Sequence, residues 1–415
     1  MKGTEKVRWH LIARFAILTA LLGGLLALPA LVEAQIAVRG NVVHPVSGPA
    51  LEDGIVLVGA DGRIEAVGPA GEVQVPDGVE TLQAAVVTPG LVDARSVVGL
   101  AGYLNQPHDQ DQLETSSAIQ PELRAIDAYN AREELVGWVR SLGTTTLHTG
   151  HGPGSLMSGQ TMVVKTRGDN VGEAVVDSVT MVAMTLGPEV SQMIPGGPGT
   201  RAKGIAQLRQ QFVRAQEYQR RAGENGGGDR DLQMEILGRM LDGEVKALIT
   251  ANRISEIMAA LRLAEEFGLD LVLDGAAEAY LVTDEIRAAG VPVIVHPTLA
   301  RHSGTLEHGT YDAAKRLHDA GLQVTLQSGF EGYVPKTRVL LFEAGMAAAY
   351  GLSFENTLEA ITLQAARIIG QDHRVGSLEP GKDGDLVLYD GDPFEYLTRV
   401  CTVIIEGEVV SDECR

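Results

Sequence analysis

Strand-like and helix-like segments alternate through the middle of this chain, between residues 87 and 373. Apolar runs rich in β-branched residues stand at 144–149, 161–166, 245–250, 270–275, 291–297 and 322–329. Helical patterns that end in Gly stand at 122–143, 255–268, 278–290, 310–321 and 356–370. This alternation is typical of parallel βαβ units. Its length favours an eight-stranded βα barrel over a doubly wound sheet.

The two ends of the chain differ from the middle, because both read as short β elements. Residues 35–86 contain a hairpin pattern with Asp61-Gly62 at its turn, and residues 374–415 carry similar runs. Two other segments are predicted to be irregular. Residues 222–229 are typical of a flexible linker, and residues 187–204 of a long loop that covers the barrel mouth or forms mobile surface.

The first 34 residues have the pattern of a secretory signal peptide. Four basic residues precede an almost wholly apolar run from Phe15 to Val32, and the small residue Ala34 follows. We expect cleavage after Ala34, hence a periplasmic or secreted protein without stable membrane insertion. The alternative is an uncleaved anchor, since the run is close to spanning length. Pro29 and the Gly23-Gly24 pair weaken that alternative.

The formal charge of the chain is −20, and it becomes −22 once residues 1–34, with four basic and two acidic side chains, are removed. A protein this acidic repels nucleic acid and anionic membrane surfaces. The expected partners are therefore proteins or small molecules.

Both cysteines, Cys401 and Cys414, lie near the C-terminus on either side of a predicted hairpin that turns at Glu406-Gly407. A two-residue turn leaves the two cysteines out of register, so a bulge or a frayed end is needed to join them. An oxidising compartment favours a structural disulfide, and the sequence leaves the free thiols open as the alternative.

Several segments together resemble the metal-dependent amidohydrolase superfamily, in the branch of imidazolonepropionase. The most specific is the ordered string at 361–393, and the others are "VVTPGLVDA" at 86–94, "QPELRAIDAYN" at 120–130, 141–148, 152–168, 261–273 and 278–295. The resemblance implies a TIM-like (β/α)8 barrel plus a small β-sandwich domain built from both chain ends. The implied domains are the sandwich parts 35–86 and 374–415 and the barrel 87–373.

The same resemblance implies a metal-activated water that attacks a C–N bond. Its ligands are a His-x-His pair on the first barrel strand, one His after the fifth and one after the sixth, and an Asp after the eighth. In this chain the corresponding positions hold Arg95 and Val97, Thr250 and Asn252, Gly275 beside Asp274, and Gly329 after Gln327-Ser328.

None of these ligand positions carries an imidazole or a carboxylate, and Arg95 adds a permanent positive charge. We therefore predict no metal and no other cofactor, and a catalytically degenerate protein, a pseudoenzyme. Arg95 is expected to form an internal pair with Asp93 or Asp274, or else to hold a ligand carboxylate. The predicted ligand-binding residues are Arg95, Asn252, Asp274 and Gln327.

A second hypothesis keeps catalysis and moves the site. His148, His151 and His296 end or follow barrel strands, where active sites of this fold lie, and a relocated zinc site on them is one form of it. A metal-free site with acid–base groups such as Asp274, Glu278 and Glu331 is the other. The simpler interpretation is ordinary mouth residues and a solvated polar loop.

The sequence thus predicts an exported amidohydrolase-like protein that binds a small ligand or acts as a partner subunit, for example of an active related amidohydrolase. The alternative is an active hydrolase of dipeptide or non-peptide C–N bonds, and a purely structural surface-interaction protein is a third class. A homo- or hetero-oligomer is compatible with each. The sequence identifies neither the ligand nor the oligomeric state, and it does not say whether the barrel mouth is open.

Overall fold

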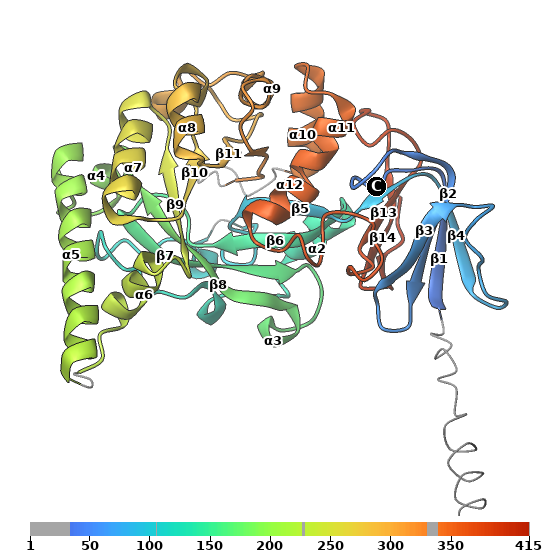
Figure 1. The fold of residues 1–415 in the computed structure, drawn as a ribbon, viewed down its shortest axis with the longest axis horizontal. Helices are drawn as coiled ribbons and strands as arrows, with labels where there is room; N and C mark the ends of the chain where they lie inside the picture. Colours follow the sequence, from blue (N-terminus) through green and yellow to red (C-terminus); the bar gives the residue numbers. More distant parts are fainter. Residues whose placement is uncertain (1–33, 105, 226–228, 330–338, 415) are drawn as a thin grey trace, which may run out of the picture.

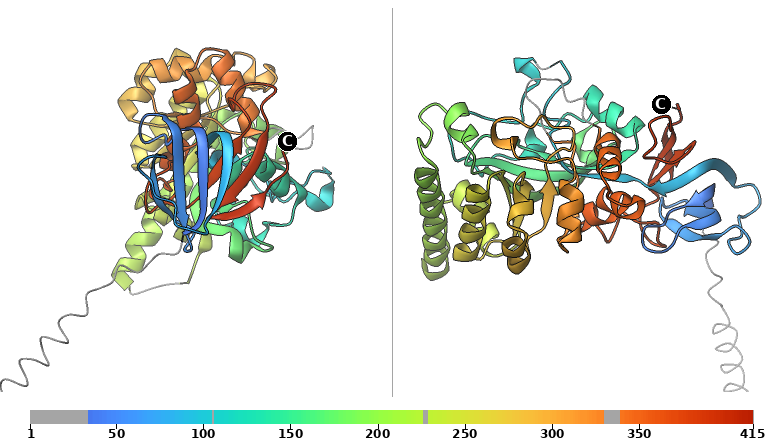
Figure 2. Two further views of the ribbon diagram at one scale, coloured as in Figure 1. Left: turned by 90° about the vertical axis from the view of Figure 1, so that its right-hand side faces the viewer. Right: turned by 90° about the horizontal axis from the view of Figure 1, so that it is seen from above.

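The computed structural model describes residues 34–104, 106–225, 229–329 and 339–414. Two β-sheets organise this part of the chain, an eight-stranded barrel sheet and a separate seven-stranded sheet (Figure 1). Two further views show the separate sheet standing at one end of the barrel (Figure 2). The fold is therefore the expected TIM-like barrel with a β domain from both chain ends. The predicted signal peptide, residues 1–34, lies outside the described residues except for Ala34.

The barrel strands follow one another in chain order around the sheet. They are β5 (Leu91–Ser96), β6 (Thr144–Gly150), β7 (Met157–Lys165), β8 (Val175–Thr185), β9 (Lys246–Ala251), β10 (Leu271–Gly275), β11 (Val293–Val295) and β12 (Val324–Thr325). The ring closes just beyond β12, where the Gly329 amide donates a 3.1 Å hydrogen bond to the Arg95 carbonyl of β5. The first and last strands thus bring Arg95 and Gly329 together.

One strand runs against the expected parallel direction. Strand β7 pairs antiparallel with both β6 and β8. The connections on either side of it, residues 151–156 and 166–174, are too short for a helical crossover, so they form hairpin-like links. The prediction of parallel βαβ units throughout was wrong here. Strand β8 was also absent from the predicted strands.

The barrel helices were partly predicted. They are α2 (Glu134–Ser141), α3 (Val171–Ala174), α4 (Glu189–Met193), α5 (Arg201–Asn225), α6 (Leu232–Leu241), α7 (Ile254–Phe267), α8 (Thr283–Ala289), α9 (Ala313–Asp319), α10 (Leu340–Ala349), α11 (Phe354–Ala360) and α12 (Leu363–Ile368), with 3-10 turns at 107–109, 125–127, 279–281 and 304–306. Helices α7 and α9 match predicted segments. Helix α5 was missed, and it includes residues 222–225 of the predicted linker; residues 226–228 lie outside the described residues. No helix in the described part of the chain is long and apolar enough to cross a membrane.

The separate sheet has the strand order β15-β14-β13-β4-β1-β2-β3. Its members are β1 (Ala34–Val43), β2 (Leu51–Gly59), β3 (Ile64–Pro69), β4 (Glu80–Pro89), β13 (Leu386–Tyr389), β14 (Val400–Ile405) and β15 (Glu408–Ser411). Strand β4 joins the two chain ends, because it pairs parallel with β1 and antiparallel with β13. It then leads through Gly90 directly into barrel strand β5.

The C-terminal hairpin holds the disulfide whose pairing the sequence left open. Glu406 and Gly407 form the turn, both with positive φ (48° and 78°), as a two-residue turn between twisted strands requires. A register shift between Val403 and Ile404 then offsets the two strands. This bulge provides the offset that the spacing of the two cysteines requires, and Cys401 and Cys414 form a disulfide bond.

A buried lysine attaches the separate sheet to the barrel. Lys165, at the end of β7, has 3% of its side chain exposed, and its Nζ lies 2.6 Å from Asp385 Oδ2 and 3.1 Å from Asp383 Oδ2. Arg374 also pairs with Asp383, at 2.9 Å. Because a buried charge without a partner is costly, this group holds the residues just before β13 against the barrel.

An apolar layer fills the barrel interior below its carboxyl end. The layer includes Val92 and Ala94 of β5, Val163 of β7, Met181 and Ala183 of β8, Leu248 of β9, Val272 of β10 and Ile294 of β11. Residues two apart on a strand share a face. The next inward positions toward the carboxyl end of the strands are therefore Thr250, Asp274 and His296, and a polar layer begins there.

Candidate functional site at the barrel mouth

Arg95 and Asp274 form the centre of the polar layer. Arg95 Nε lies 3.7 Å from Asp274 Oδ2, and their side chains are 3% and 5% exposed. Strands β5 and β10 are not neighbours in the sheet, so the pair spans the interior. The internal pair with Asp274 is thus one of the two pairs that the sequence suggested.

Asp274 is also held by neutral groups from two other strand ends. Its Oδ1 accepts a 2.7 Å hydrogen bond from Gln327 Nε2, and its Oδ2 accepts a 2.5 Å bond from the Thr250 hydroxyl. The predicted ligand-binding residues Arg95, Asp274 and Gln327 therefore lie together. Gln327 also donates to the Val295 carbonyl, which fixes its amide orientation.

The Arg95 guanidinium keeps one donor without a partner. Its Nη2 donates a 2.6 Å hydrogen bond to the His151 carbonyl. Its Nη1 is buried and has no hydrogen-bond partner among the described residues. Burial lowers the pKa of Arg95, and the nearby Asp274 acts in the opposite direction. A buried guanidinium N–H without an acceptor is costly, so this atom marks the place where a ligand acceptor would fit.

A second buried carboxylate, Asp93, lies on the same strand. It accepts hydrogen bonds from the Arg95 amide at 3.2 Å, from the Ser328 amide at 3.1 Å and from the Ser328 hydroxyl. Burial raises the pKa of Asp93 to about 6, against the effect of these hydrogen bonds. The contact closes the ring between β5 and the chain after β12. Sequence reasoning placed Asp93 near Arg95 but gave no sign of its bond to Ser328.

Two glycines occupy strand-end positions where the superfamily pattern implies ligands. Gly275 has a φ of 79°, and a Cβ on it would lie 2.6 Å from Asn252 Oδ1. Gly329 has a φ of 67°, and a Cβ on it would lie 2.5 Å from Pro297 Cγ. L-residues with side chains rarely adopt such φ values. The backbone at both positions therefore disfavours any side chain, including a ligand.

Asn252 lies beside Gly275 and is half-buried. Its Oδ1 is buried without a hydrogen-bond partner among the described residues. Its backbone N–H donates to Glu256 Oε2 at 3.1 Å, and its backbone carbonyl accepts from the Glu278 backbone N–H at 2.8 Å. The backbone is thus fixed while the side-chain oxygen remains available. Asn252 is the fourth predicted ligand-binding residue.

His148 is fully buried, and both of its ring nitrogens are engaged. Nδ1 lies 2.7 Å from the Ala94 carbonyl, which can only accept, so Nδ1 carries the proton. Nε2 lies 2.6 Å from the Thr161 hydroxyl. Burial lowers the pKa of His148 to about 3. The ring is therefore neutral at physiological pH and tied into the sheet, which leaves no lone pair for a metal or a substrate.

His151 follows β6, and its imidazole is also buried. Nε2 has no hydrogen-bond partner among the described residues. Burial lowers the pKa of His151 to about 4, and the charge of Arg95 acts in the same direction. The imidazole is therefore neutral near pH 7.

His296 points toward a different group of residues. Its Nδ1 donates to the Pro297 carbonyl at 2.9 Å, and its ring packs edge-on to His302 at 6.0 Å between centroids. Among the described residues, no three His, Cys, Asp or Glu side chains are grouped so that they could hold a metal ion. The relocated site on His148, His151 and His296 is therefore not assembled. Glu331 lies outside the described residues.

The model of the amidohydrolase family matches residues 245–410. A solved amidohydrolase from Thermotoga maritima MSB8 superposes with a TM-score of 0.85 at 28% identity, covering 91% of this chain and all of that one. The chain belongs to the amidohydrolase superfamily. The predicted family and fold are thereby confirmed.

Two curated proteins of this superfamily match most of the chain. The imidazolonepropionase of Streptococcus gordonii is 23% identical over 402 residues, which cover 87% of this chain and 91% of that protein. Amidohydrolase tasK of Hapsidospora irregularis is 26% identical over 400 residues. That match covers 88% of this chain but only 40% of the larger protein, so this chain spans less than half of its length.

The metal that the superfamily pattern implies does not fit the residues present. An ion of this kind needs about three or four protein donors with free lone pairs. The strand ends offer a guanidinium at Arg95, the buried alkyl side chain of Val97, the hydroxyl of Thr250, the neutral amide of Asn252, and bare backbone at Gly275 and Gly329. Two carboxylates lie nearby. Asp274 already accepts from Gln327 and Thr250, and Asp93 already accepts from Ser328 and from the Arg95 amide.

Proposed function

We propose that this protein is an exported, catalytically degenerate amidohydrolase that binds a small carboxylate-bearing ligand at the barrel mouth. The observation that carries the proposal is the Arg95–Asp274 pair. A positively charged side chain stands where the superfamily pattern places metal ligands, and a carboxylate neutralises it from across the barrel. The scaffold is retained while the donor set for hydrolysis is replaced.

The backbone supports the same reading. Gly275 and Gly329 stand at two implied ligand positions, and both have positive φ values that residues with side chains rarely adopt. A single substitution can be reversed by one mutation, but a side chain at either position needs a local rearrangement as well. These two positions therefore support the proposal that the chain does not hold the metal.

The ligand chemistry follows from the unsatisfied polar atoms. Arg95 Nη1 offers a charged donor, and Asn252 Oδ1 offers an acceptor. A guanidinium N–H pairs best with a carboxylate oxygen, and an amide oxygen accepts from an N–H or O–H of the same ligand. A small amino or imidazole carboxylic acid carries both groups. The name imidazolonepropionase, borne by several relatives, also points to a carboxylate-bearing small molecule.

Calorimetric titration with imidazole-4-propionate tests the proposal. We expect saturable binding to the wild type. Binding to Asn252→Ala should be about tenfold weaker, because this variant loses one hydrogen bond to a charged or polar group of the ligand. Asn356→Ala, on α11 and outside the mouth, is the matched control and binds as the wild type does. Turnover of the ligand's hydrolysable analogue imidazolone propionate by the wild type would contradict the degenerate state.

A role as partner subunit is compatible with the same scaffold, because a degenerate copy can associate with an active relative. Export is the other untested element of the proposal. N-terminal sequencing of the protein recovered from the extracytoplasmic fraction should begin at Gln35, and recovery of the protein with Met1 would contradict cleavage.

A second candidate function, a metal-free hydrolase of C–N bonds, is favoured by one observation. The imidazole of His151 has an unpartnered Nε2 and a pKa of about 4, so it is neutral and available as a weak base beside the Arg95 charge. Hydrolysis of small dipeptides that is unaffected by a chelator and abolished in His151→Gln would establish it. We expect no such turnover.

A further inference from the structure

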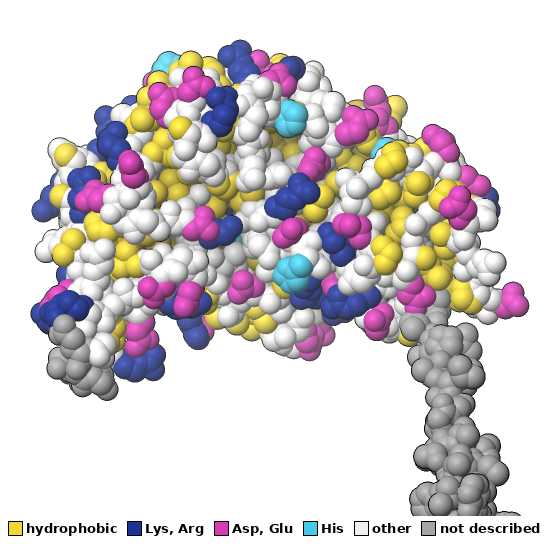
Figure 3. Space-filling view, viewed as in Figure 1, with side chains coloured by type: hydrophobic (Ala, Val, Ile, Leu, Met, Phe, Trp, Pro, Cys, Tyr) yellow, Lys and Arg dark blue, Asp and Glu magenta, His cyan; other side chains and the backbone are white. Residues whose placement is uncertain are grey.

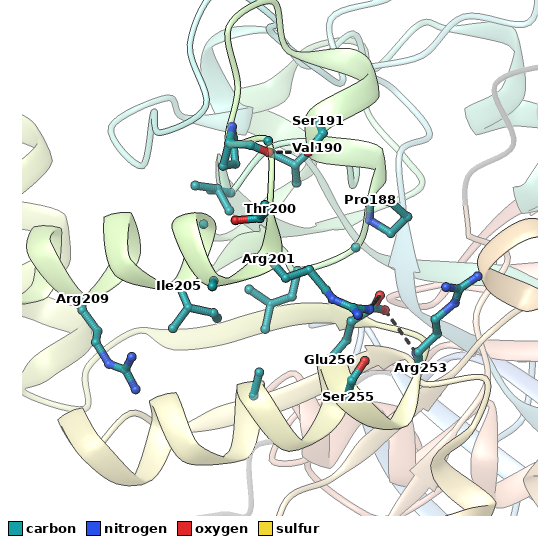
Figure 4. Close-up of a pocket in the computed structure, with 18 of the residues that line it drawn as sticks. Pro188, Val190, Ser191, Thr200, Arg201, Ile205, Arg209, Arg253, Ser255 and Glu256 are labelled. Carbon is teal, nitrogen blue, oxygen red and sulfur yellow. Dashed lines mark hydrogen bonds and ion pairs between the residues drawn. The ribbon is translucent and has the colours of Figure 1, made fainter.

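A cleft opens beside the barrel mouth, near the carboxyl ends of β8 and β9. It has a volume of about 570 Å³ and lies between α4, the start of α5 and the start of α7 (Figure 4). Part of its wall is the segment 187–204, which the sequence suggested as a long loop. Four arginines line it, namely Arg201, Arg209, Arg253 and Arg262, and we call it the arginine cleft.

The acidic side chains do not balance these arginines. Glu256 is the one carboxylate among the lining residues, and its side chain is fully buried. Its Oε2 accepts from the Asn252 and Arg253 amides, both at 3.1 Å. Its Oε1 lies 3.5 Å from Arg201 Nη1, which reaches it across the cleft. Glu256 therefore has little hydrogen-bonding capacity left for the side chains of the other three arginines.

Two of those arginines remain short of acceptors. Arg253 Nη2 donates a 3.4 Å hydrogen bond to the Gly304 carbonyl and lies 3.6 Å from Glu307 Oε1, while its Nε is buried with no hydrogen-bond partner among the described residues. Arg262 is exposed and makes no ion pair within the described part of the chain. Arg209 is paired with Glu266 at 2.6 Å. The cleft thus presents Arg262 and the Arg253 Nε as donors that the protein itself leaves unused.

The positive charge of the cleft contrasts with the negative net charge of the whole chain. The chain as a whole carries a net charge of −20. On the face shown in Figure 3, acidic and basic side chains are interspersed, and neither sign forms a broad patch. Helices α5 and α7 also begin at the cleft, and the positive ends of their dipoles add to the field there. An anion is favoured at this place in spite of the overall charge.

We propose that the arginine cleft binds a small molecule that carries a phosphoryl group. Guanidinium groups recognise phosphate oxygens by paired, charge-assisted hydrogen bonds. Several arginines around one cleft suit a multiply charged anion better than a single carboxylate. The volume lies within the range of about 300–1,000 Å³ typical of small-molecule sites. This site is separate from the proposed carboxylate site at Arg95, and it does not depend on it.

Glu256 connects the two sites structurally. It touches Arg201 in the cleft and the backbone of Asn252 at the mouth. An anion that draws Arg201 toward the cleft centre therefore competes with Glu256 for the same guanidinium. The full chain should be used for every measurement, because both sites depend on α7.

Calorimetric titration with inorganic pyrophosphate tests the proposal. The wild type should bind it saturably at one site. Arg262→Gln and Arg253→Gln should each bind about tenfold more weakly, because each loses a charge-assisted contact. Arg214→Gln is the matched control and should bind as the wild type does. Arg214 lies on α5 outside the residues that line the cleft, is exposed, and donates to Gln211.

Equal thermal midpoints of the four proteins establish that the variants are folded. Citrate distinguishes the ligand chemistry, since it is a small polyanion without phosphorus. Binding of citrate as tight as that of pyrophosphate would overturn the phosphoryl assignment. Absence of saturable pyrophosphate binding, or the same weakening in Arg214→Gln as in the cleft variants, would overturn the site.

Discussion

The guanidinium of Arg95 faces the carboxylate of Asp274 across the barrel, with 3.7 Å between Nε and Oδ2. The two residues come from strands that are not neighbours, and both are buried. The pair lies at strand ends where the superfamily pattern implies metal ligands. The attraction between the two charges holds both side chains at the centre of the barrel mouth. It leaves Arg95 Nη1 without a hydrogen-bond partner among the described residues, so this atom can bind a ligand.

Removing one member of this pair should be costly. Arg95→Met leaves Asp274 buried without its counter-charge, and we expect the free energy of unfolding to fall by about 3 kcal/mol. Urea denaturation measures it. Arg39→Met is the matched control, because Arg39 pairs with Asp53 on the surface, where solvent screens the charges; its effect should be much smaller.

Neutralising the second member should restore stability. In Arg95→Met/Asp274→Asn the remaining amide can still bond to Gln327 and Thr250, and no buried charge is left alone. The double variant should regain more than half of the loss. A double variant that is no more stable than Arg95→Met would show that packing, and not charge, dominates at Arg95.

The pH dependence of stability should carry a signature of His148. Its pKa is lowered to about 3 by burial, below the unfolded value of about 6.5. The folded state therefore disfavours the proton, and stability is lost as pH falls below the unfolded pKa. Between about pH 7.5 and about pH 5 this group should account for a loss of roughly 2 kcal/mol.

Comparison with His148→Gln isolates this contribution, because glutamine can still donate to Ala94 and accept from Thr161. The variant should lose less stability than the wild type over the same pH interval. Asp93 acts with the opposite sign: its raised pKa of about 6 makes the folded state relatively more favourable as pH falls below that value. Identical pH slopes in wild type and His148→Gln would contradict the neutral, buried imidazole.

The backbone at Gly275 should reject a side chain. Gly275→Ala combines a positive φ with a Cβ contact of 2.6 Å to Asn252 Oδ1. We expect the free energy of unfolding to fall by about 2 kcal/mol. Gly268→Ala is the matched control. Gly268 has a φ of 68° and open space around its Cβ position, so that variant carries the conformational strain alone. Equal thermal midpoints for the two variants would contradict a destabilising clash between the added Cβ at position 275 and Asn252.

The Cys401–Cys414 bond closes a short loop with a sequence separation of 13. Loss of the bond should cost at most about 3 kcal/mol, mainly through the entropy of the unfolded chain. Thermal denaturation of Cys401→Ala/Cys414→Ala with and without reductant measures it. The reductant should lower the midpoint of the wild type to that of the variant and leave the variant unchanged.

Local patterns predicted the parts of the fold that depend on nearby residues. The strand-like run at 245–250 and the helical pattern at 255–268 became β9 and α7 within a residue or so, because apolar periodicity and a terminal glycine were both present. The antiparallel course of β7 was missed because strand direction depends on the length of its connections. Helix α5 was missed because its polar sequence shows only a weak apolar stripe.

The site was predicted where it depended on residue type and not where it depended on distant contacts. The resemblance to the amidohydrolase superfamily placed Arg95, Asp274 and Gln327 at strand ends of one barrel, and they meet there. The bond between Asp93 and Ser328 and the arginine cleft join residues that are far apart in the chain. No local spacing indicates such contacts, since they exist only once the strands and helices are packed.

The metal content of the purified protein tests the central claim most directly. Plasma mass spectrometry on the protein, expressed with added zinc and passed through gel filtration without chelator, gives the metal-to-chain ratio. We predict less than about one tenth of an equivalent of zinc, because the strand ends lack the three or four donors that such an ion needs. About one tightly held zinc per chain, lost on substitution of Asp274, would contradict the account.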